Sequence, residues 1–355
     1  MIFSRNYDLL FDRRGNVLNG AIAQDDLSVE VFDSLQADAV DISALGSGEH
    51  KRNMPVIQWN ANLEEMFQQE WEKIKSYWDN GGCTLPWEVE RVLSADRQKK
   101  FETRGTNSRL YWSQGGIGSC MSHASTFAGH SGLLSRIALG DNRIYVPHNP
   151  IVTFAISKNG SLRGGQTVSE MAKFANEIGN FPEYLVGENN QAIPANYRSC
   201  FEEALDYQWS LAFLTGRNAS DLAEQIIMVC KAGFGVAFAN STAVSGATQD
   251  GNGIKIAVIR GSWAHATHFV AYRVVDDTEY VGWVNSHGPI YGSSSEDEPA
   301  DMCWMTRAQL ETMCESSFGY GAPYVVIPES IWIPSRQLIS DFFVKRPVNF
   351  KFQAA

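Results

Sequence analysis

Residues 113–124 read SQGGIGSCMSHA, and the rest of the chain can be interpreted outward from this stretch. Cys120 begins an apolar segment with helical spacing, and the positive end of a helix dipole favours a cysteine thiolate. Gln114 stands six residues earlier, so its side-chain amide can lie beside the backbone N–H of Cys120. Two such donors stabilise the oxyanion of an acyl-transfer reaction. The stretch therefore predicts a cysteine nucleophile with its oxyanion hole.

A cysteine nucleophile needs a histidine to take its proton and a polar side chain to orient that histidine. Residues 261–277, GSWAHATHFVAYRVVDD, contain two candidates, His265 and His268. They lie three residues apart on an expected strand and so point to opposite faces, which means that only one can serve. Residues 283–292, WVNSHGPIYG, supply Asn285 as the orienting group. Its carbonyl would accept the second N–H of the histidine and fix the ring's tautomer.

These motifs resemble those of the papain-like cysteine peptidases. The residues that fit the family's Q-G-x-C-G-S-C-W signature are Gln114, Gly118, Ser119 and Cys120. Ile117 replaces the family's first cysteine, and Met121 replaces its tryptophan. Without that cysteine the usual disulfide of the active-site loop is absent, which indicates a reducing compartment. We therefore expect an intracellular product, or one assembled inside a cell, without a signal peptide.

The resemblance favours His265 as the base. In the family the histidine is followed by a small residue, then by a small residue and a tyrosine six and seven positions later. Ala266, Ala271 and Tyr272 stand at these positions relative to His265. His268 stays open as the alternative base because it lies closer in sequence to the asparagine.

Two further segments carry the resemblance. Asn285 begins an Asn-Ser-x-Gly sequence in which His287 replaces the family's tryptophan, so we expect a wetter histidine–asparagine hydrogen bond and weaker activity. Gly164 and Gly165 match the glycine pair whose backbone binds an extended peptide substrate. Glycine suits this role because it lets another backbone approach closely. Arg163, beside the pair, is interpreted as a surface residue.

The resemblance covers residues 105–330 and implies an α+β, papain-like fold. A helical part at about 105–215 and an antiparallel β part at about 216–330 would enclose the active-site cleft between them. Residues 1–104 are expected to form an N-terminal extension that is a permanent structural part and not an inhibitory propeptide. Residues 331–355 form an aromatic-rich C-terminal tail.

Periodicity and capping residues predict the individual elements. Helices are expected at 62–79, at 87–93, at 120–137, from Thr167 to about Ile178, from Asn218 or Ser220 to Gly233, and from Thr306 to about Cys314. Strands are expected at 28–32, 235–239, 254–259, 268–275, 280–284 and 324–327. Helices followed by strands are typical of an α+β fold. The helix at 62–79 should bury Leu63, Phe67, Trp71 and Ile74, which share one face.

Composition limits the functions that the chain can have. Its 355 residues are 44% hydrophobic and 12% aromatic, which indicates a globular protein, and the net charge of −11 argues against a nucleic-acid-binding surface. No apolar run is long enough to span a membrane. The six cysteines show no zinc-like spacing, so we expect neither a metal nor another cofactor.

Several reactive or charged residues have simpler interpretations. Five cysteines are interpreted as buried and inert: Cys83, Cys200, Cys230, Cys303 and Cys314. His123, one turn after Cys120, is interpreted as a polar helix residue that points away from the cleft. The acidic segment 293–301 is interpreted as a solvated loop.

The sequence thus predicts a papain-like thiol hydrolase that acts on a peptide or protein substrate. The alternative is a structural component of a large assembly, such as a phage virion, that retains the papain-like fold. The long extension and the aromatic tail favour that alternative, in which neighbouring subunits are the partners. The tail's phenylalanines are Phe342, Phe343, Phe350 and Phe352. Neither hypothesis involves a membrane or a nucleic acid.

Overall fold

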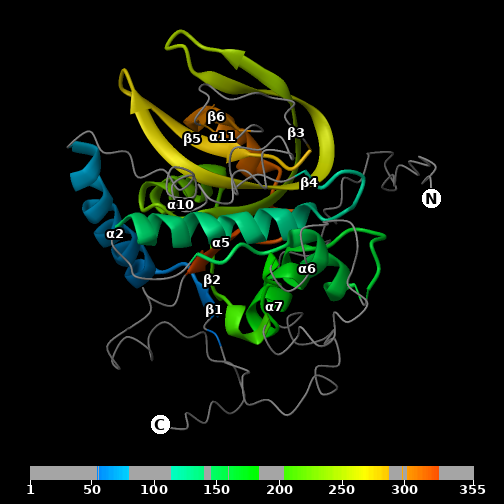
Figure 1. Ribbon diagram of the computed structural model, residues 1–355. Helices are drawn as coiled ribbons and strands as arrows, with labels where there is room; N and C mark the ends of the chain where they lie inside the picture. The colour runs from blue at the N-terminus through cyan, green and yellow to red at the C-terminus, as the bar shows by residue number, and fades with distance from the viewer. Residues whose placement is uncertain are drawn as a thin grey trace, which may run out of the picture.

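The computed structural model describes residue 54 and residues 56–79, 113–139, 145–158, 160–183, 204–287, 298 and 302–327. In these ranges a seven-stranded sheet is combined with helices (Figure 1). The elements in chain order are β1 (Val56–Gln58), α2 (Ala61–Asp79), α5 (Cys120–Ala138), α6 (Pro150–Ser157), α7 (Val168–Glu177), η4 (Leu205–Tyr207), β2 (Ser210–Phe213), α10 (Ala219–Lys231), β3 (Val236–Gln249), β4 (Lys255–Val275), β5 (Thr278–Val284), β6 (Met302–Thr306), α11 (Arg307–Glu315) and β7 (Tyr324–Ile327). The predicted α+β fold class is confirmed.

The sheet has the strand order β1-β2-β7-β3-β4-β5-β6 and is antiparallel between all these neighbours except β1 and β2. β4 is 21 residues long and curves, so that Ile256 near its start pairs with Trp304 of β6 while its end pairs with β5 (Figure 1). The two separate strands predicted at 254–259 and 268–275 are therefore wrong, because the residues between them continue the pairing with β3. His265 lies inside this long strand.

Polar caps determine where the helices begin, as the sequence predicts. The side chain of Thr167 accepts a hydrogen bond from the N–H of Glu170, and the Glu170 carboxylate accepts one from the N–H of Thr167. At α10 the cap is Asn218 and not Ser220, because the Asn218 side chain accepts from the backbone in the first turn. The capping box predicted for α11 is also present. Each such cap stabilises a helix by about 1 kcal/mol.

Five elements were missed, namely α6, the short 3-10 helix η4, β1, β2 and β6. α6 is buried along nearly its whole length and apolar on all sides, so it has no helical periodicity to detect. Its signal was local: Asn149 caps it and Pro150 opens its first turn. The three strands have three to five residues, which is too short for a clear alternation.

α5 lies against the sheet (Figure 1), and small side chains form part of the contact. Ala124 and Ala128 of α5 share a cluster with Ala264 and Ala266 of β4. The approach to the start of β3 is so close that a Cβ on Gly235 would lie 2.6 Å from the Cα of Ala128. This close packing brings the start of α5 against the middle of β4.

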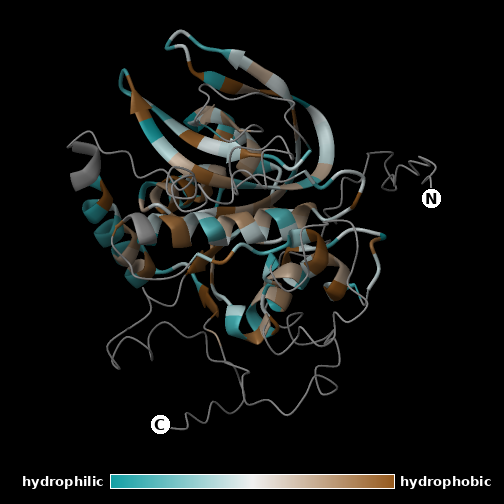
Figure 2. Cartoon of the chain, in the orientation of Figure 1, coloured by the Kyte–Doolittle hydropathy of each residue, from teal (hydrophilic) through white to brown (hydrophobic). Residues whose placement is uncertain are grey.

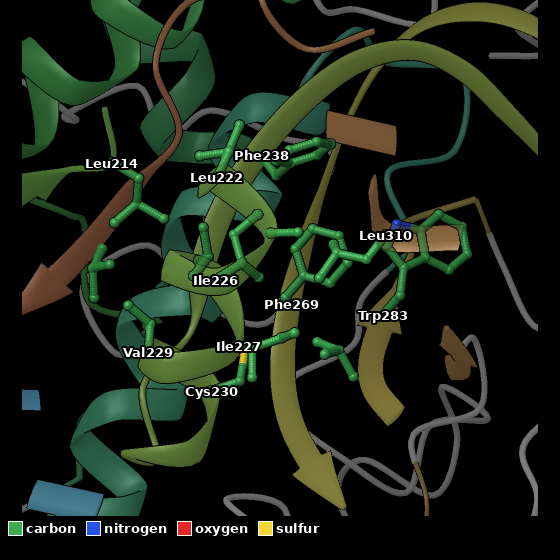
Figure 3. Packing of buried hydrophobic residues seen from close by; sticks show 14 of the residues in the cluster. Leu214, Leu222, Ile226, Ile227, Val229, Cys230, Phe238, Phe269, Trp283 and Leu310 are labelled. Atoms are coloured by element: carbon green, nitrogen blue, oxygen red, sulfur yellow. The ribbon is translucent and has the colours of Figure 1, made fainter. Parts of the chain in front are cut away.

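The largest hydrophobic cluster lies between α10 and the sheet (Figure 3). Leu222 and Ile226 of α10 share it with Phe238 of β3 and Phe269 of β4, whose rings are 5.2 Å apart in an edge contact. Burial of each such side chain stabilises the fold by about 1.5–3 kcal/mol. The cluster therefore anchors β4, the strand that contains His265, against β3 and α10.

α2 packs into the same core, although α5, the next described element, begins about 40 residues later at Cys120. Leu63, Phe67 and Ile74 are buried, as predicted, and hydrophilic residues lie along the outer side of the helix (Figure 2). Trp71 is only partly buried, with its ring 6.1 Å from that of Tyr272. The predicted apolar face is thus confirmed for three of its four residues.

A buried ion pair ties α2 to the last turn of α5. Glu70 is 5% exposed and Arg136 is 6% exposed, and the Arg136 guanidinium hydrogen-bonds the Glu70 carboxylate. The same guanidinium donates to the carbonyl of Ala232 at 3.1 Å, and the Lys73 ammonium lies 2.6 Å from Glu70. Two charges so far from water are tolerated only because each has its partner.

Glu298 corrects the expectation of a solvated acidic loop at 293–301. Its side chain is buried and accepts hydrogen bonds from the Trp304 indole at 3.0 Å and from Arg273 at 3.3 Å. The Arg273 guanidinium also lies over the Trp304 ring, 4.0 Å from its centroid. The carboxylate is therefore part of the packing of β6 against β4.

Several predictions fall outside the described residues. These are the strand at 28–32, the helix at 87–93, the path of residues 80–104 and the tail 331–355. The predictions about a propeptide, the domain limits and an assembly therefore stay predictions. None of the helices in the described ranges combines the length and the hydrophobicity that crossing a lipid bilayer requires.

Candidate active site

Cys120 is the first residue of α5 and is fully buried. Its side chain packs with Ala266 of β4, and the backbone N–H groups of Ala266, of Met121 and of Cys120 itself favour the charged form of the thiol. Ala266 follows His265 on β4, so this contact places the start of the helix directly against the strand residue beside the predicted base.

The electrostatics of Cys120 differ from the prediction. Burial raises the pKa of the thiol to about 12, although the three backbone N–H groups act in the opposite direction. Desolvation disfavours the charged form, and here it outweighs the favourable dipoles at the helix start. The resting thiol is therefore protonated at neutral pH, so a nucleophile at this position needs a base.

His265 and Asn285 are joined by a short buried hydrogen bond. His265 Nε2 lies 2.6 Å from Asn285 Oδ1, and the two residues are 0% and 1% exposed. Asn285 Oδ1 also accepts the backbone N–H of Ser286 at 2.8 Å, which identifies it as the oxygen. Because an amide oxygen only accepts, Nε2 carries the proton, and Nδ1 of the neutral ring is the basic atom.

The alternative base, His268, lies elsewhere. Its ring is buried against Phe127, with 5.7 Å between the ring centroids. Phe127 is seven residues after Cys120, about two turns along α5. The structure therefore brings His265, and not His268, to Asn285.

His123, interpreted as a polar helix residue that points away from the cleft, is fully buried. Its Nδ1 lies 2.9 Å from the carbonyl oxygen of Ser119, and Nε2 has no hydrogen-bond partner among the described residues. Burial lowers its pKa to about 4, so the ring is neutral. The bond to Ser119 turns Nδ1 toward its own helix.

The expectation of a wet histidine–asparagine bond is wrong, because His287 covers it. The rings of His265 and His287 are stacked, with centroids 4.0 Å apart and an interplanar angle of 26°. Trp263 lies at their edges, 4.8 Å from His265 and 5.7 Å from His287. Trp263 was missed, although its place two residues before His265 on a strand puts both on one face.

Gln114 forms hydrogen bonds with two segments, one at Ser286 and one at Ile117. Its Oε1 accepts from the Ser286 hydroxyl at 2.6 Å, and its backbone N–H donates to the Ser286 carbonyl at 2.8 Å. Its Nε2 donates to the carbonyl of Ile117 at 2.7 Å. Ser286, which was not predicted as a site residue, thus joins the glutamine to the segment that carries Asn285.

The glycine pair lies beside the cysteine loop. A Cβ on Gly118 would come within 2.0 Å of the carbonyl oxygen of Gly164, so the two backbones touch. Gly164 is exposed and has φ +81°, a conformation that side chains other than glycine rarely adopt. Gly165 is partly exposed, and Arg163 is exposed, as expected.

Buried polar contacts hold this glycine segment in place. The Gln166 side chain accepts from the Ser122 hydroxyl at 2.9 Å and donates to the Ser157 hydroxyl at 2.9 Å. It therefore joins the glycine segment to both α5 and α6. Within the described ranges, no three His, Cys, Asp or Glu side chains converge to form a metal site.

Replacing Gly118 by alanine should damage the site, because the new Cβ would overlap the Gly164 carbonyl. We expect a loss of about 2 kcal/mol in the free energy of unfolding. The matched control is Gly319→Ala, where an added Cβ meets nothing within 4 Å. Denaturant unfolding of both variants tests this, and equal stability would contradict the close contact.

Comparisons with known proteins were made on sequence and on structure. No protein-family model and no curated protein matches the chain. Solved structures do match. The Amb a 11 cysteine protease of ragweed pollen, in its proform, is 15% identical, with 61% of this chain and 61% of that chain covered and a TM-score of 0.41. This chain thus matches 61% of the length of the ragweed protease.

Two further matches are similar. Xylellain, a cysteine protease from Xylella fastidiosa, is 13% identical, with 61% of this chain and 81% of that chain covered and a TM-score of 0.41. Digestive procathepsin L 3 of the Tenebrio molitor larval midgut is 14% identical, with 84% and 97% covered and a TM-score of 0.41. These structures are papain-like cysteine proteases, the family that the motifs around Cys120 resemble. The residue assignments that follow rest on the contacts described above.

Proposed function

We propose that this chain is a papain-like thiol hydrolase that cleaves peptide bonds through Cys120, His265 and Asn285. The observation that carries the proposal is the buried 2.6 Å hydrogen bond between His265 and Asn285. The residue after His265 on β4, Ala266, packs with Cys120. Nucleophile, base and orienting group are the three parts that such a reaction needs.

The first step is transfer of the thiol proton to His265. Nε2 is engaged with Asn285, so Nδ1 is the atom that accepts the proton. The thiol has a raised pKa, so it is deprotonated as it attacks the substrate carbonyl rather than beforehand. The Asn285 oxygen stabilises the imidazolium that forms, as an orienting group does in other triads.

The second step is collapse of the tetrahedral intermediate. One N–H of Gln114 Nε2 is used by Ile117, and the other is assigned, with the N–H of Cys120, to the oxyanion. The leaving amine takes its proton from His265, and Cys120 keeps the acyl group as a thioester. Water then attacks this thioester, His265 takes and returns the water's proton, and the acid product and the free thiol are released.

The substrate is an extended peptide that lies along Gly164 and Gly165. Exposed glycine backbone supports this, because main-chain N–H and C=O groups there can pair with a peptide strand. The contact between Gly118 and Gly164 joins that surface to the cysteine loop. No cofactor enters any step.

Hydrolysis of a fluorogenic peptide library by the wild-type chain and by Cys120→Ala tests the proposal. We expect kcat/KM to fall by about 10⁴-fold or more in Cys120→Ala, because removing the nucleophile leaves only binding and oxyanion stabilisation. Cys230→Ala is the control, since Cys230 is a buried core residue of α10. Equal activity in the wild type and Cys120→Ala would rule out the proposed function.

A further inference from the structure

Two aromatic rings, those of His287 and Trp263, contact the side chain that the proposed function makes the base. His287 stacks on the face of His265, with ring centroids 4.0 Å apart, and Trp263 meets both rings at their edges. Trp263 is itself fixed, since its indole N–H donates to Asn240 Oδ1 at 3.3 Å and its ring stacks on Trp283 at 6.5 Å. Trp263 is therefore held by the sheet, and His287 comes from the segment after β5.

The stack limits how the His265 ring can move. One hydrogen bond to Asn285 fixes a point on the ring but leaves rotation about that bond open. A ring parallel to its face blocks the rotation, because tilting His265 would push it into His287. The orientation of Nδ1, the atom that the proposed function makes the proton acceptor, is then fixed as well.

The stack also affects the charge that forms during catalysis. When His265 accepts the thiol proton it becomes a cation, and the face of a neutral aromatic ring attracts a cation. A charged His287 would instead repel it, because like charges a few ångströms apart disfavour each other. The benefit therefore requires that His287 be neutral.

We infer that His287 is a positioning residue that acts as a neutral ring, holding the His265 imidazole in plane with Asn285 and stabilising its protonated form. This inference rests on the proposed function and extends it to a residue outside the proposed triad. Burial supports the neutral state, since it lowers the pKa of His287 to about 4. Two titratable groups near His287 are His265 on β4 and His123 on α5. His123 is itself neutral, with its pKa lowered to about 4.

The test compares His287→Ala with His287→Phe, which keeps a ring but cannot be protonated. We expect His287→Ala to lower kcat about 30-fold with KM within about twofold, because a positioning residue acts on the chemical step. His287→Phe should restore kcat to within about threefold of the wild type. Its kcat profile should coincide with that of the wild type between about pH 5 and pH 8, where His287 is uncharged.

Each outcome decides the inference. If His287→Ala keeps the wild-type kcat, or if His287→Phe fails to restore it while melting at the wild-type temperature, the positioning role is wrong. If His287→Phe is faster and its profile is shifted, His287 is charged in the wild type and the neutral-ring account is wrong. Cys120-dependent hydrolysis in the wild type separates these failures from a failure of the proposed function, which would remove that activity altogether.

Discussion

Replacing His265 by glutamine is expected to lower kcat/KM by about 10³-fold, because glutamine can still hydrogen-bond Asn285 but cannot take a proton. The same substitution at His268 is the matched control. Both histidines are buried in β4, three residues apart, but His268 packs on Phe127 and not on Asn285. We expect His268→Gln to change kcat/KM by no more than about threefold.

Steady-state kinetics at pH 7, with melting temperatures for both variants, measures this. A larger loss in His268→Gln would mean that the base is assigned to the wrong histidine. Similar losses in both, matched by similar drops in melting temperature, would mean that both histidines act through folding alone.

Replacing Glu70 by alanine is expected to lower the free energy of unfolding by about 3–5 kcal/mol, because it leaves the buried Arg136 guanidinium without its counter-charge. Glu70 also holds Lys73, but Lys73 has its side chain 61% exposed and can be solvated. The neighbouring exposed Glu65 is the control on the same helix, and Glu65→Ala should stay within about 0.5 kcal/mol of the wild type.

The double variant Glu70→Leu with Arg136→Met separates charge from packing. Replacing both charges by apolar groups removes the uncompensated ion, so most of the lost stability should return. Urea unfolding of the four proteins tests this. If Glu70→Ala were as stable as Glu65→Ala, α2 would not depend on this ion pair for its place against α5.

The sequence predicted correctly those features that depend on residues close together in the chain. The capping box of Thr167 and Glu170 and the cap at Asn218 depend on residues only a few positions apart, and both helices begin where predicted. The pairing of His265 with Asn285 depended on their order along consecutive strands and on the spacing of the motif. The packing of Cys120 against Ala266 could not be predicted in this way, because it depends on the tertiary contact between α5 and β4.

Other features depend on contacts between residues far apart in the chain, so no short stretch of sequence predicts them. Glu70 and Arg136 are 66 residues apart, and Ser286 and Gln114 are 172 residues apart. The continuity of β4 was missed because its middle does not alternate: Arg260, Gly261 and Ser262 are all exposed, and the residues from Trp263 to Tyr272 are all buried. The raised pKa of Cys120 likewise follows from burial, which no motif encodes.

The central claim is that His265 takes the proton of the Cys120 thiol and so activates it as a nucleophile, and the rate at which iodoacetamide labels Cys120 tests this most directly. The described cysteines Cys120, Cys230, Cys303 and Cys314 are all buried, so burial alone does not distinguish them. We predict that peptide mapping at neutral pH finds Cys120 labelled about tenfold or more faster than the other three, and that His265→Gln removes this difference. Equal rates at all four cysteines, or faster labelling of Cys230, Cys303 or Cys314, would contradict the account.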